Sequence, residues 1–563
     1  MRRLALVGML VGLLVGSLSL LVPVGASAQG FEYSVQGTRA FGRGGAFAAR
    51  GDDPSTLGLN PAGMLEWPGY PLQIGTHLAF HDACVERAGT YNDSVPDGVI
   101  PSRFGPIDSA DPGNWINQRF PRVCNGGYPA PSPNVVFTGR ITPDLAFGIG
   151  LLAPSGVNNG LWGAHDATVV GPDGRLLPSP VRYGLVEQDL LLFYPTFGLA
   201  WRPTPWLRLG AAFEWGMAIV RFVNFTNAGA GPEDPGTDVR TQLDVSDLFV
   251  PAIVGSVHIV PADSLDIVLH TRISDGINDS GTLTVTTGTF GDPAMSDSYQ
   301  PYTTRFPGTT LQAGQPWTFG LAIRYSDRNR WRASDPAAVT GLTGRVEDHM
   351  QRENWDLELD VTYTHNSQVR DFIVTVPAGS DAGICTQTDG CPEGPTIGAA
   401  LDRRDAMGNR VPKALPIPHG WNDQVSFRLG GDLNLLPGQF TLRGGLSFTT
   451  SGFSSRYQTQ DFMPAMRFGL YLGATVRFER LDISFAYAHI FQIDESTVDA
   501  NFRPIAAIGS EGQCEDAGGD VYDPSNPVTA RGCYPQGFGA VVNNGRYTAD
   551  FNVLSLQVSY HFE

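Results

Sequence analysis

Apolar and polar residues alternate one by one along several stretches of the chain. From residue 207 to residue 219 the odd positions are all apolar, whereas the even positions carry Arg208, Glu214, glycine and alanine. The same alternation recurs at residues 317–325, 355–363, 440–448, 466–478 and 481–491. Successive side chains of a strand point to opposite faces, so this pattern predicts strands with one apolar and one polar face.

The alternating stretches and the turn residues between them predict about 14 strands. They cover residues 71–82, 132–141, 145–153, 186–202, 206–222, 247–260, 265–275, 315–326, 354–366, 422–436, 439–451, 464–478, 481–492 and 546–562. The links between these strands alternate in length. Tight links lie at 142–144, 203–205, 261–264, 437–438 and 479–480, and most of the others run to dozens of residues.

An even number of strands joined alternately by short turns and long loops is typical of an outer-membrane β-barrel. Two links depart from the rule: 327–353 is long for a turn, and 452–463 is short for a loop. A soluble β-sandwich also alternates, and periodicity alone leaves it open. The link lengths favour an all-β fold, a 14-stranded antiparallel transmembrane β-barrel over residues 71–563. In such a barrel the acidic row Asp356, Glu358 and Asp360 would suit a wet lumen.

The N-terminus has the features of a secretory signal peptide. Arg2 and Arg3 precede an apolar run over residues 4–21, and Ala26-Ser27-Ala28 offers a small-residue cleavage site. We predict a signal peptide over residues 1–28, with a retained membrane anchor as the alternative. Residues 29–70 would then precede the barrel on the periplasmic side. This glycine-rich stretch is predicted to fold into the lumen as a plug.

The net charge and the cysteines indicate which partners and which cellular compartment the protein can have. The formal net charge of −18 argues against a nucleic-acid partner. Six cysteines fall in pairs within single predicted outer loops, which predicts loop-local disulfides in an oxidising compartment. The predicted bonds are Cys84–Cys124, Cys385–Cys391 and Cys514–Cys533. No CxxC motif or nearby histidine supports a zinc site, and no cofactor or metal is predicted.

The stretch GTRAFGRGGAFAARGDDPSTLGLNPAGM, residues 37–64, resembles the N-terminal hatch of the FadL/TodX (OmpP1) family of outer-membrane transporters for hydrophobic compounds. The resemblance implies a 14-stranded barrel with a hatch in its lumen, and passive transport of long-chain fatty acids or aromatic hydrocarbons. It places the hatch motif on Asn60, Pro61 and Ala62. Apolar residues of this region are the candidates to line the ligand path: Phe31, Phe41, Phe47 and Leu57.

The family implies that the solute leaves sideways through the barrel wall. In the stretch 145–152 the inward positions include Gly148 and Gly150, and glycine inside a strand often marks a kink or bulge. The resemblance implies a kink in this strand beside the hatch, so Gly148 and Gly150 are the candidate lateral opening. The alternative is that these small residues make room for the hatch. Pro195 and Pro251 are rival weak points.

The last predicted strand ends the chain with alternating apolar residues up to Phe562. Outer-membrane barrels finish in this way on an aromatic-ended strand that the barrel-assembly machinery recognises. Expected partners are therefore a hydrophobic small molecule, outer-membrane lipid and lipopolysaccharide, and the assembly machinery.

Two other functions stay open. A general porin needs an open, charged lumen, and six inward charges are candidates to line one: Arg208, Glu214, Arg324, Arg428, Asp432 and Arg443. An outer-membrane lipase could place a catalytic histidine at His489, which points outward near the end of its strand, although the chain lacks a GxSxG elbow.

Overall fold

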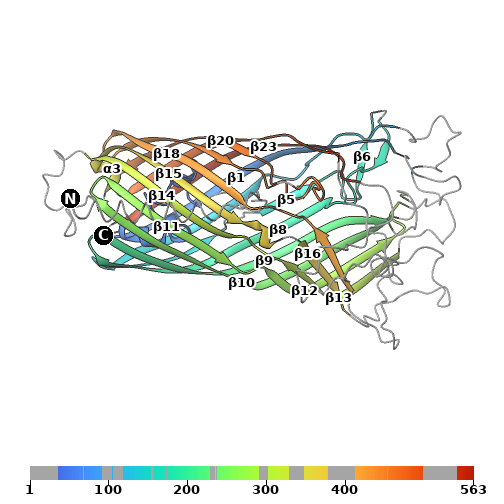
Figure 1. Cartoon of the computed structure of the whole chain (residues 1–563), viewed down its shortest axis with the longest axis horizontal. Helices are drawn as coiled ribbons and strands as arrows, with labels where there is room; N and C mark the ends of the chain where they lie inside the picture. Colours follow the sequence, from blue (N-terminus) through green and yellow to red (C-terminus); the bar gives the residue numbers. More distant parts are fainter. Residues whose placement is uncertain are drawn as a thin grey trace, which may run out of the picture.

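Fourteen strands form a closed antiparallel barrel in the computed structural model of the chain (Figure 1). The structure describes residues 36–67, 69–91, 104, 118–153, 157–172, 174–227, 235, 238–290, 302–328, 348–369, 371–377, 413–452, 454–498 and 542–562. In order around the barrel the strands are β1 (Tyr70–Arg87), β3 (Ala130–Thr142), β4 (Leu145–Leu152), β8 (Glu187–Thr204), β9 (Leu207–Asn227), β10 (Asp238–Ala262), β11 (Leu265–Ser274), β14 (Trp317–Arg328), β15 (Glu353–His365), β18 (Gln424–Leu436), β19 (Phe440–Thr449), β20 (Arg467–Phe478), β21 (Leu481–Gln492) and β23 (Gly545–Phe562). The first and last strands close the ring, from Tyr70 opposite Phe562 to Arg87 opposite Gly545. The predicted fold class is confirmed, and each predicted stretch falls on one of these strands.

The barrel wall shows the expected two faces. In β9, Phe213, Trp215 and Ile219 are exposed on the outside, whereas Arg208 and Glu214 are buried on the inside. Backbone groups are paired around the whole ring, so the apolar outer surface can face lipid without unsatisfied polar groups. The chain is therefore a bacterial outer-membrane protein. Among the described residues, no helix has both the length and the hydrophobicity to span a bilayer.

One end of the barrel carries the tight turns and the C-terminus, and the other end extends well beyond the wall (Figure 1). At the extended end β10 pairs with β12 (Ile277–Thr287), β12 with β13 (Tyr302–Ala313), β13 with β16 (Asp371–Val376) and β16 with β17 (Lys413–Pro418). The remaining short strands are β2 (Val123–Cys124), β5 (Val157–Leu161), β6 (Thr168–Val170), β7 (Leu176–Pro178) and β22 (Glu495–Thr497). The sequence predicts only loops in these places. The short ones among these strands have too few residues to show the ten-residue alternation of a membrane strand.

A disulfide joins Cys84 to Cys124, as the cysteine spacing predicts. Cys84 does not lie in a loop, because β1 continues to Arg87 and pairs Cys84 directly with Cys124 of β2. The other four cysteines lie outside the described residues.

Residues 36–66, here called the inner segment, run inside the barrel. The segment contains α2 (Thr38–Phe41) and two 3-10 helices, η1 (Pro54–Gly58) and η2 (Pro61–Leu65). Nearly all of its residues are buried. It packs against strands from opposite parts of the wall, including β21 and β23 at α2 and β8, β9 and β10 at η2. Among the described residues, two further short helices lie outside it, α3 (His349–Arg352) between β14 and β15, and η7 (Asn366–Gln368).

Candidate functional site

The motif Asn60-Pro61-Ala62 forms a compact corner of the inner segment. The Asn60 side-chain amide donates a hydrogen bond of 2.6 Å to the carbonyl of Ala48, and Thr56 Oγ1 donates one of 2.8 Å to the carbonyl of Asn60. Pro61 begins η2, where a missing N–H leaves no unpaired donor. The motif thus ties two distant parts of the segment together.

The same corner lies directly against the wall. The backbone N–H of Ala62 donates to Ser256 Oγ of β10 at 3.0 Å. On β9, a Cβ atom added to Gly210 would lie 2.0 Å from the backbone nitrogen of Ala62. Only glycine lets the strand approach the segment so closely. The part that this corner plays in transport stays a prediction.

Gly148 of β4 also makes room for the inner segment. A Cβ atom there would lie 2.6 Å from Met64 Sδ and 3.0 Å from Leu57 Cδ1. At Gly150 the added atom would instead meet Val136 of the neighbouring strand at 3.1 Å. The ladders that β4 forms with β3 and β8 continue past both glycines. Contact with the segment therefore accounts for Gly148, and a lateral opening at Gly148 and Gly150 stays a prediction.

The apolar residues predicted to line a ligand path lie between the segment and the wall. The ring of Phe41 lies 4.9 Å from the ring of His77 and 5.3 Å from that of Tyr471. The buried members of the predicted set are Phe41, Phe47 and Leu57. Phe31 lies outside the described residues. The buried rings anchor the segment, and a role in lining a ligand path stays a prediction.

An ionic cluster fixes the inner segment to β15 and β18. Nη1 of the buried Arg43 lies 2.8 Å from Asp356 Oδ1 and 2.8 Å from Asp432 Oδ1, and its Nη2 lies 3.2 Å from Glu358 Oε2. Burial disfavours the charged guanidinium, but the three carboxylates outweigh this cost and keep the pKa of Arg43 above its usual value. Arg43 therefore stays a cation in the middle of the barrel.

Backbone groups of the segment bind the same acidic row. Glu358 accepts hydrogen bonds from the N–H of Ala49 at 2.7 Å and of Arg50 at 3.1 Å. Asp360 accepts one from the N–H of Phe47 at 3.2 Å. The expectation that this row faces a wet lumen is wrong, because the segment occupies that space and supplies the donors.

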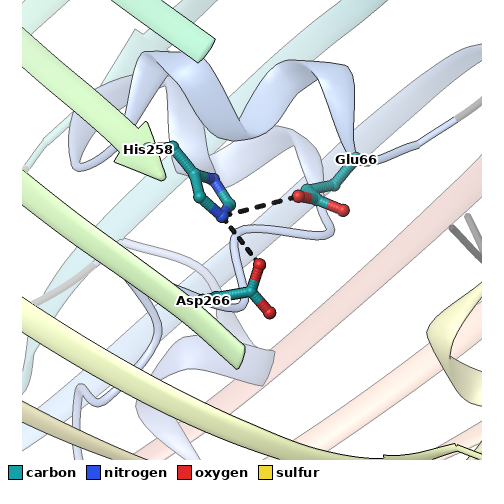
Figure 2. Close-up of side chains that lie close together, drawn as sticks. All are labelled: Glu66, His258 and Asp266. Carbon is teal, nitrogen blue, oxygen red and sulfur yellow. Dashed lines mark hydrogen bonds and ion pairs between the residues drawn. The ribbon is translucent and has the colours of Figure 1, made fainter. Parts of the chain in front are cut away.

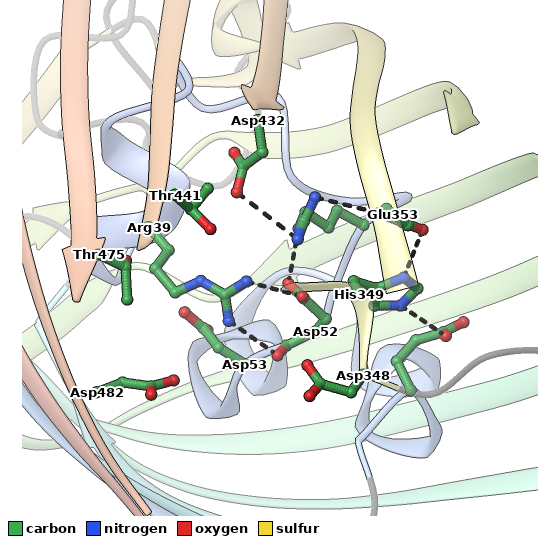
Figure 3. Close-up of polar contacts among 12 residues, drawn as sticks. Arg39, Asp52, Asp53, Asp348, His349, Glu353, Asp432, Thr441, Thr475 and Asp482 are labelled. Carbon is green, nitrogen blue, oxygen red and sulfur yellow. Dashed lines mark hydrogen bonds and ion pairs between the residues drawn. The ribbon is translucent and has the colours of Figure 1, made fainter. Parts of the chain in front are cut away.

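A second layer of the cluster lies within the segment itself. Nη2 of Arg39 lies 2.7 Å from Asp52 Oδ2, and Nε of Arg50 lies 3.0 Å from Asp52 Oδ1 (Figure 3). Burial raises the pKa of Asp52, but the two guanidinium groups outweigh burial and hold that pKa well below its usual range. Arg50 also reaches Asp356 at 3.1 Å, so both layers form one network.

The end of the segment is held by a helix outside the barrel strands. Nδ1 of His349 in α3 lies 2.7 Å from Glu353 Oε1, and its Nε2 lies 3.2 Å from Glu66 Oε2 (Figure 3). The long link between β14 and β15 therefore contributes a bridge between the wall and the last residue of the segment.

Glu66 also belongs to a buried trio with His258 and Asp266 (Figure 2). Nitrogen and oxygen donors so arranged can hold a divalent cation. Here, however, His258 Nε2 lies 2.9 Å from Asp266 Oδ1, Glu66 pairs with Arg208, and Asp266 pairs with Arg324 at 3.3 Å. Hydrogen bonds and ion pairs account for the trio without an ion.

The six inward charges predicted for a porin all have partners. Glu214 accepts from Arg272 Nε at 2.7 Å, and Arg428 donates to Thr362 Oγ1 at 3.1 Å. Arg443 donates to Thr475 Oγ1 at 2.7 Å, and Arg208, Arg324 and Asp432 belong to the groups described above. These charges are therefore bound by side chains of the wall or of the inner segment.

A buried apolar group also lies inside the barrel. Buried side chains pack there into one continuous group, here called the apolar column, that reaches from the outer links down to Leu57 and Met64 of the inner segment. Its larger members are Leu152, Leu190, Leu192, Tyr194, Phe222, Leu243, Phe306, Phe372, Trp421 and Phe462. Sequence reasoning missed the column, although residues 190–194, LLLFY, are apolar on both faces and carry the signal.

Comparison with solved structures gives several matches over nearly the whole chain. A Pseudomonas aeruginosa FadL homologue matches with a TM-score of 0.59 and 15% identity, covering 95% of this chain and 100% of that one. The toluene transporter TodX of Pseudomonas putida matches at a TM-score of 0.54 and 11% identity, covering 94% of this chain and 99% of TodX. The chain has the FadL-type fold.

A third FadL-type structure, the Ralstonia pickettii toluene transporter TbuX, matches at a TM-score of 0.53 with 13% identity over 94% of this chain and 99% of that one. Neither the family models nor the curated proteins include a match to this sequence. The resemblance seen in residues 37–64 thus agrees with the FadL-type fold. TodX and TbuX are toluene transporters and the first structure is a FadL homologue; none of the three is named as an enzyme.

Proposed function

We propose that this protein lets hydrophobic small molecules diffuse across the outer membrane without an energy source. The observation that carries the proposal is the apolar column, because a porin for polar solutes needs a water-filled, polar lumen. A packed apolar interior favours solutes that gain free energy on leaving water. The FadL homologue, TodX and TbuX, whose fold the chain shares, add support.

The inner segment would act as a plug that blocks the direct path of the solute through the barrel. Its ionic cluster lies across the turn-bearing half of the interior, and an apolar solute cannot replace the hydrogen bonds of those buried charges. The solute would therefore leave through the wall next to the lower end of the column.

We place this exit along β4. Leu152, the last residue of β4, belongs to the column. Beyond it, the N–H of Ala153 donates to Gln36 Oε1 at 3.3 Å, and its carbonyl accepts from Ser132 Oγ at 2.5 Å. At Ala153 the backbone therefore bonds to side chains and not to a neighbouring strand. Two such hydrogen bonds break more readily than the continuous backbone ladder of a strand pair. Gly148 and Gly150 would make the same strand easier to kink.

Uptake and conductance measurements test the proposal. Cells that produce the protein should take up labelled toluene or oleate faster than cells without it, while the purified protein in planar bilayers should show no large steady pore. A large open pore together with uptake of sugars would establish the porin alternative instead.

The exit is tested by Gly150→Phe, whose bulk would wedge against β3, with Gly255→Phe on the outer face of β10 as the matched control. Gly255 has an open environment, since an added Cβ would meet only Thr271 Cγ2 at 3.6 Å. Uptake should be lost in the first variant while solute binding persists, and both should persist in the control. Normal uptake by Gly150→Phe would place the exit elsewhere.

The lipase alternative gains little from the structure. His489 Nδ1 lies 2.9 Å from Asn552 Oδ1, and its ring lies 4.2 Å from that of Phe491. Neither neighbour is a nucleophile, so this pair cannot attack an ester.

A further inference from the structure

One imidazole lies among the aromatic rings at the outer end of the apolar column. The ring centroid of His419 lies 4.4 Å from that of Trp421, 4.5 Å from that of Phe372 and 6.0 Å from that of Phe462. Phe222 of β9 completes this group, here called the aromatic cluster, at 6.4 Å from Phe372. The members come from two strands and two outer links, and all are buried.

The hydrogen bonds of His419 define which nitrogen carries the proton. Its Nε2 lies 3.1 Å from Asp461 Oδ2, and Asp461 also accepts from the hydroxyl of Thr459. Burial raises the pKa of Asp461, but the bond from His419 outweighs it and lowers that pKa, so the carboxyl is ionised. An ionised carboxylate only accepts hydrogen bonds, so Nε2 must be the donor.

The second nitrogen of His419, Nδ1, has no partner among the described residues. In a neutral imidazole whose Nε2 carries the proton, Nδ1 offers a lone pair. Within the part of the chain that the structure describes, nothing donates a hydrogen bond to Nδ1 of His419. Buried polar atoms of native proteins almost always have a partner, so an unpaired acceptor among aromatic rings points to a ligand that brings the donor.

The cluster lies where a solute would enter the column. Gln460, next to Asp461 in the link between β19 and β20, donates to the carbonyl of Val181 at 2.7 Å and to that of Leu185 at 3.1 Å. These side-chain bonds join two outer links across the barrel mouth. Their opening would give access to the aromatic cluster without breaking a strand ladder.

We propose that the aromatic cluster binds a neutral aromatic solute that carries one hydroxyl, a phenol, whose O–H donates to Nδ1 of the neutral form of His419. This inference rests on the proposed transport of hydrophobic solutes and names their chemical class. The aromatic rings would pack on the solute ring at edge-to-face distances. An aromatic hydrocarbon would leave Nδ1 unpaired, and a carboxylate would offer no donor and would approach the negative charge of Asp461.

Three probes that share a methyl-substituted benzene ring separate these classes: p-cresol carries a hydroxyl opposite the methyl group, toluene carries no second substituent, and 4-methylbenzoate carries a carboxylate. We expect the purified full-length protein to bind p-cresol at least about tenfold more tightly than toluene, the effect of one buried hydrogen bond. 4-Methylbenzoate should bind more weakly than either. Titration calorimetry in detergent gives the three dissociation constants. Equal affinity for p-cresol and toluene, or tightest binding of 4-methylbenzoate, would overturn the inference.

Two variants assign the preference to Nδ1. His419→Gln can keep a donor to Asp461 but loses the acceptor at the Nδ1 position, so the p-cresol preference should vanish while toluene affinity changes less than about twofold. His419→Asn can place its amide oxygen near the Nδ1 position and should keep part of the preference. A full preference in His419→Gln would refute the role of Nδ1. Both variants are compared with the unaltered protein for heat-dependent migration on gels, which reports the folded barrel.

Transport measurements keep this inference distinct from the proposed function. If toluene crosses the membrane but phenols have no advantage in binding, only the phenol site is wrong. If none of the three probes crosses, the proposed function itself is wrong.

Discussion

Replacing Arg43 by methionine should release the inner segment while leaving the barrel folded. Arg43 is fully buried and neutralises part of the charge of Asp356, Glu358 and Asp432. Methionine has a similar length but no charge, so the carboxylates would stay buried without their central cation. Loss of one partner from a buried ion pair costs about 3–5 kcal/mol, and here one side chain serves three carboxylates.

The loss of Arg43 should weaken the binding of the inner segment to the wall, while the free energy of unfolding of the barrel itself should change little. The strands close on one another from β1 to β23, and their ladder bonds do not involve Arg43. A cost of about 4 kcal/mol corresponds to roughly a thousandfold shift toward the detached segment. Single-channel recordings should therefore show frequent openings in Arg43→Met, and limited proteolysis should cut residues 36–66.

The matched control is Arg221→Met. Arg221 pairs with Asp244 at 2.8 Å, but both side chains are about half exposed on the outer wall, at 50% and 39%. Exposed pairs contribute about 0–1 kcal/mol, so this variant should behave like the unaltered protein. Adding Glu358→Gln to Arg43→Met should restore part of the attachment of the segment, because glutamine removes one of the buried negative charges that Arg43 neutralises. If Arg43→Met stays closed and resists protease, the ionic cluster does not hold the segment.

Three further predictions concern the inner segment, its contact with β9 and the cysteines. Deletion of residues 36–66 should leave a heat-modifiable barrel that conducts ions steadily; a truncated protein that still blocks current would place the plug elsewhere. Gly210→Val should displace the corner at Ala62 and raise protease sensitivity of the segment, whereas Gly255→Val should not, and equal behaviour of the two would contradict the close contact. Non-reducing peptide mapping should find Cys385–Cys391 and Cys514–Cys533 beside Cys84–Cys124, and bridges between different pairs would contradict the loop assignment.

The fold could be predicted from the sequence because membrane strands obey two simple constraints. Alternation with a period of two identifies each strand, and tight links such as 479–480 fix which strands are neighbours. The motif around Asn60 also led to the prediction of a segment inside the barrel. The extra strands β12, β13, β16 and β17 were missed because they continue the wall outside the bilayer, where no lipid imposes the alternation.

The site could be predicted only in part, because its contacts join residues that are far apart in the chain. The acidic row from Asp356 to Asp360 is visible in the sequence, but its partner Arg43 lies 313 positions before Asp356. Nothing local distinguishes carboxylates that bind a plug from carboxylates that line a channel. The surroundings of His419 likewise could not be predicted, because two strands and two outer links that are far apart in the sequence bring the aromatic cluster together.

The long-range partnership of Arg43 has a consequence for the order of assembly. The inner segment leaves the ribosome and the export channel first, whereas Asp356 and Asp432 follow more than 300 residues later, with separations of 313 and 389. The seam between β1 and β23 can form only after the final residues arrive. A barrel that closed while empty would have a water-filled lumen, and the segment would then have to enter through the mouth and displace that water. We therefore expect the segment to be seated among the nascent strands before the seam closes, as an internal template for the last steps of barrel assembly.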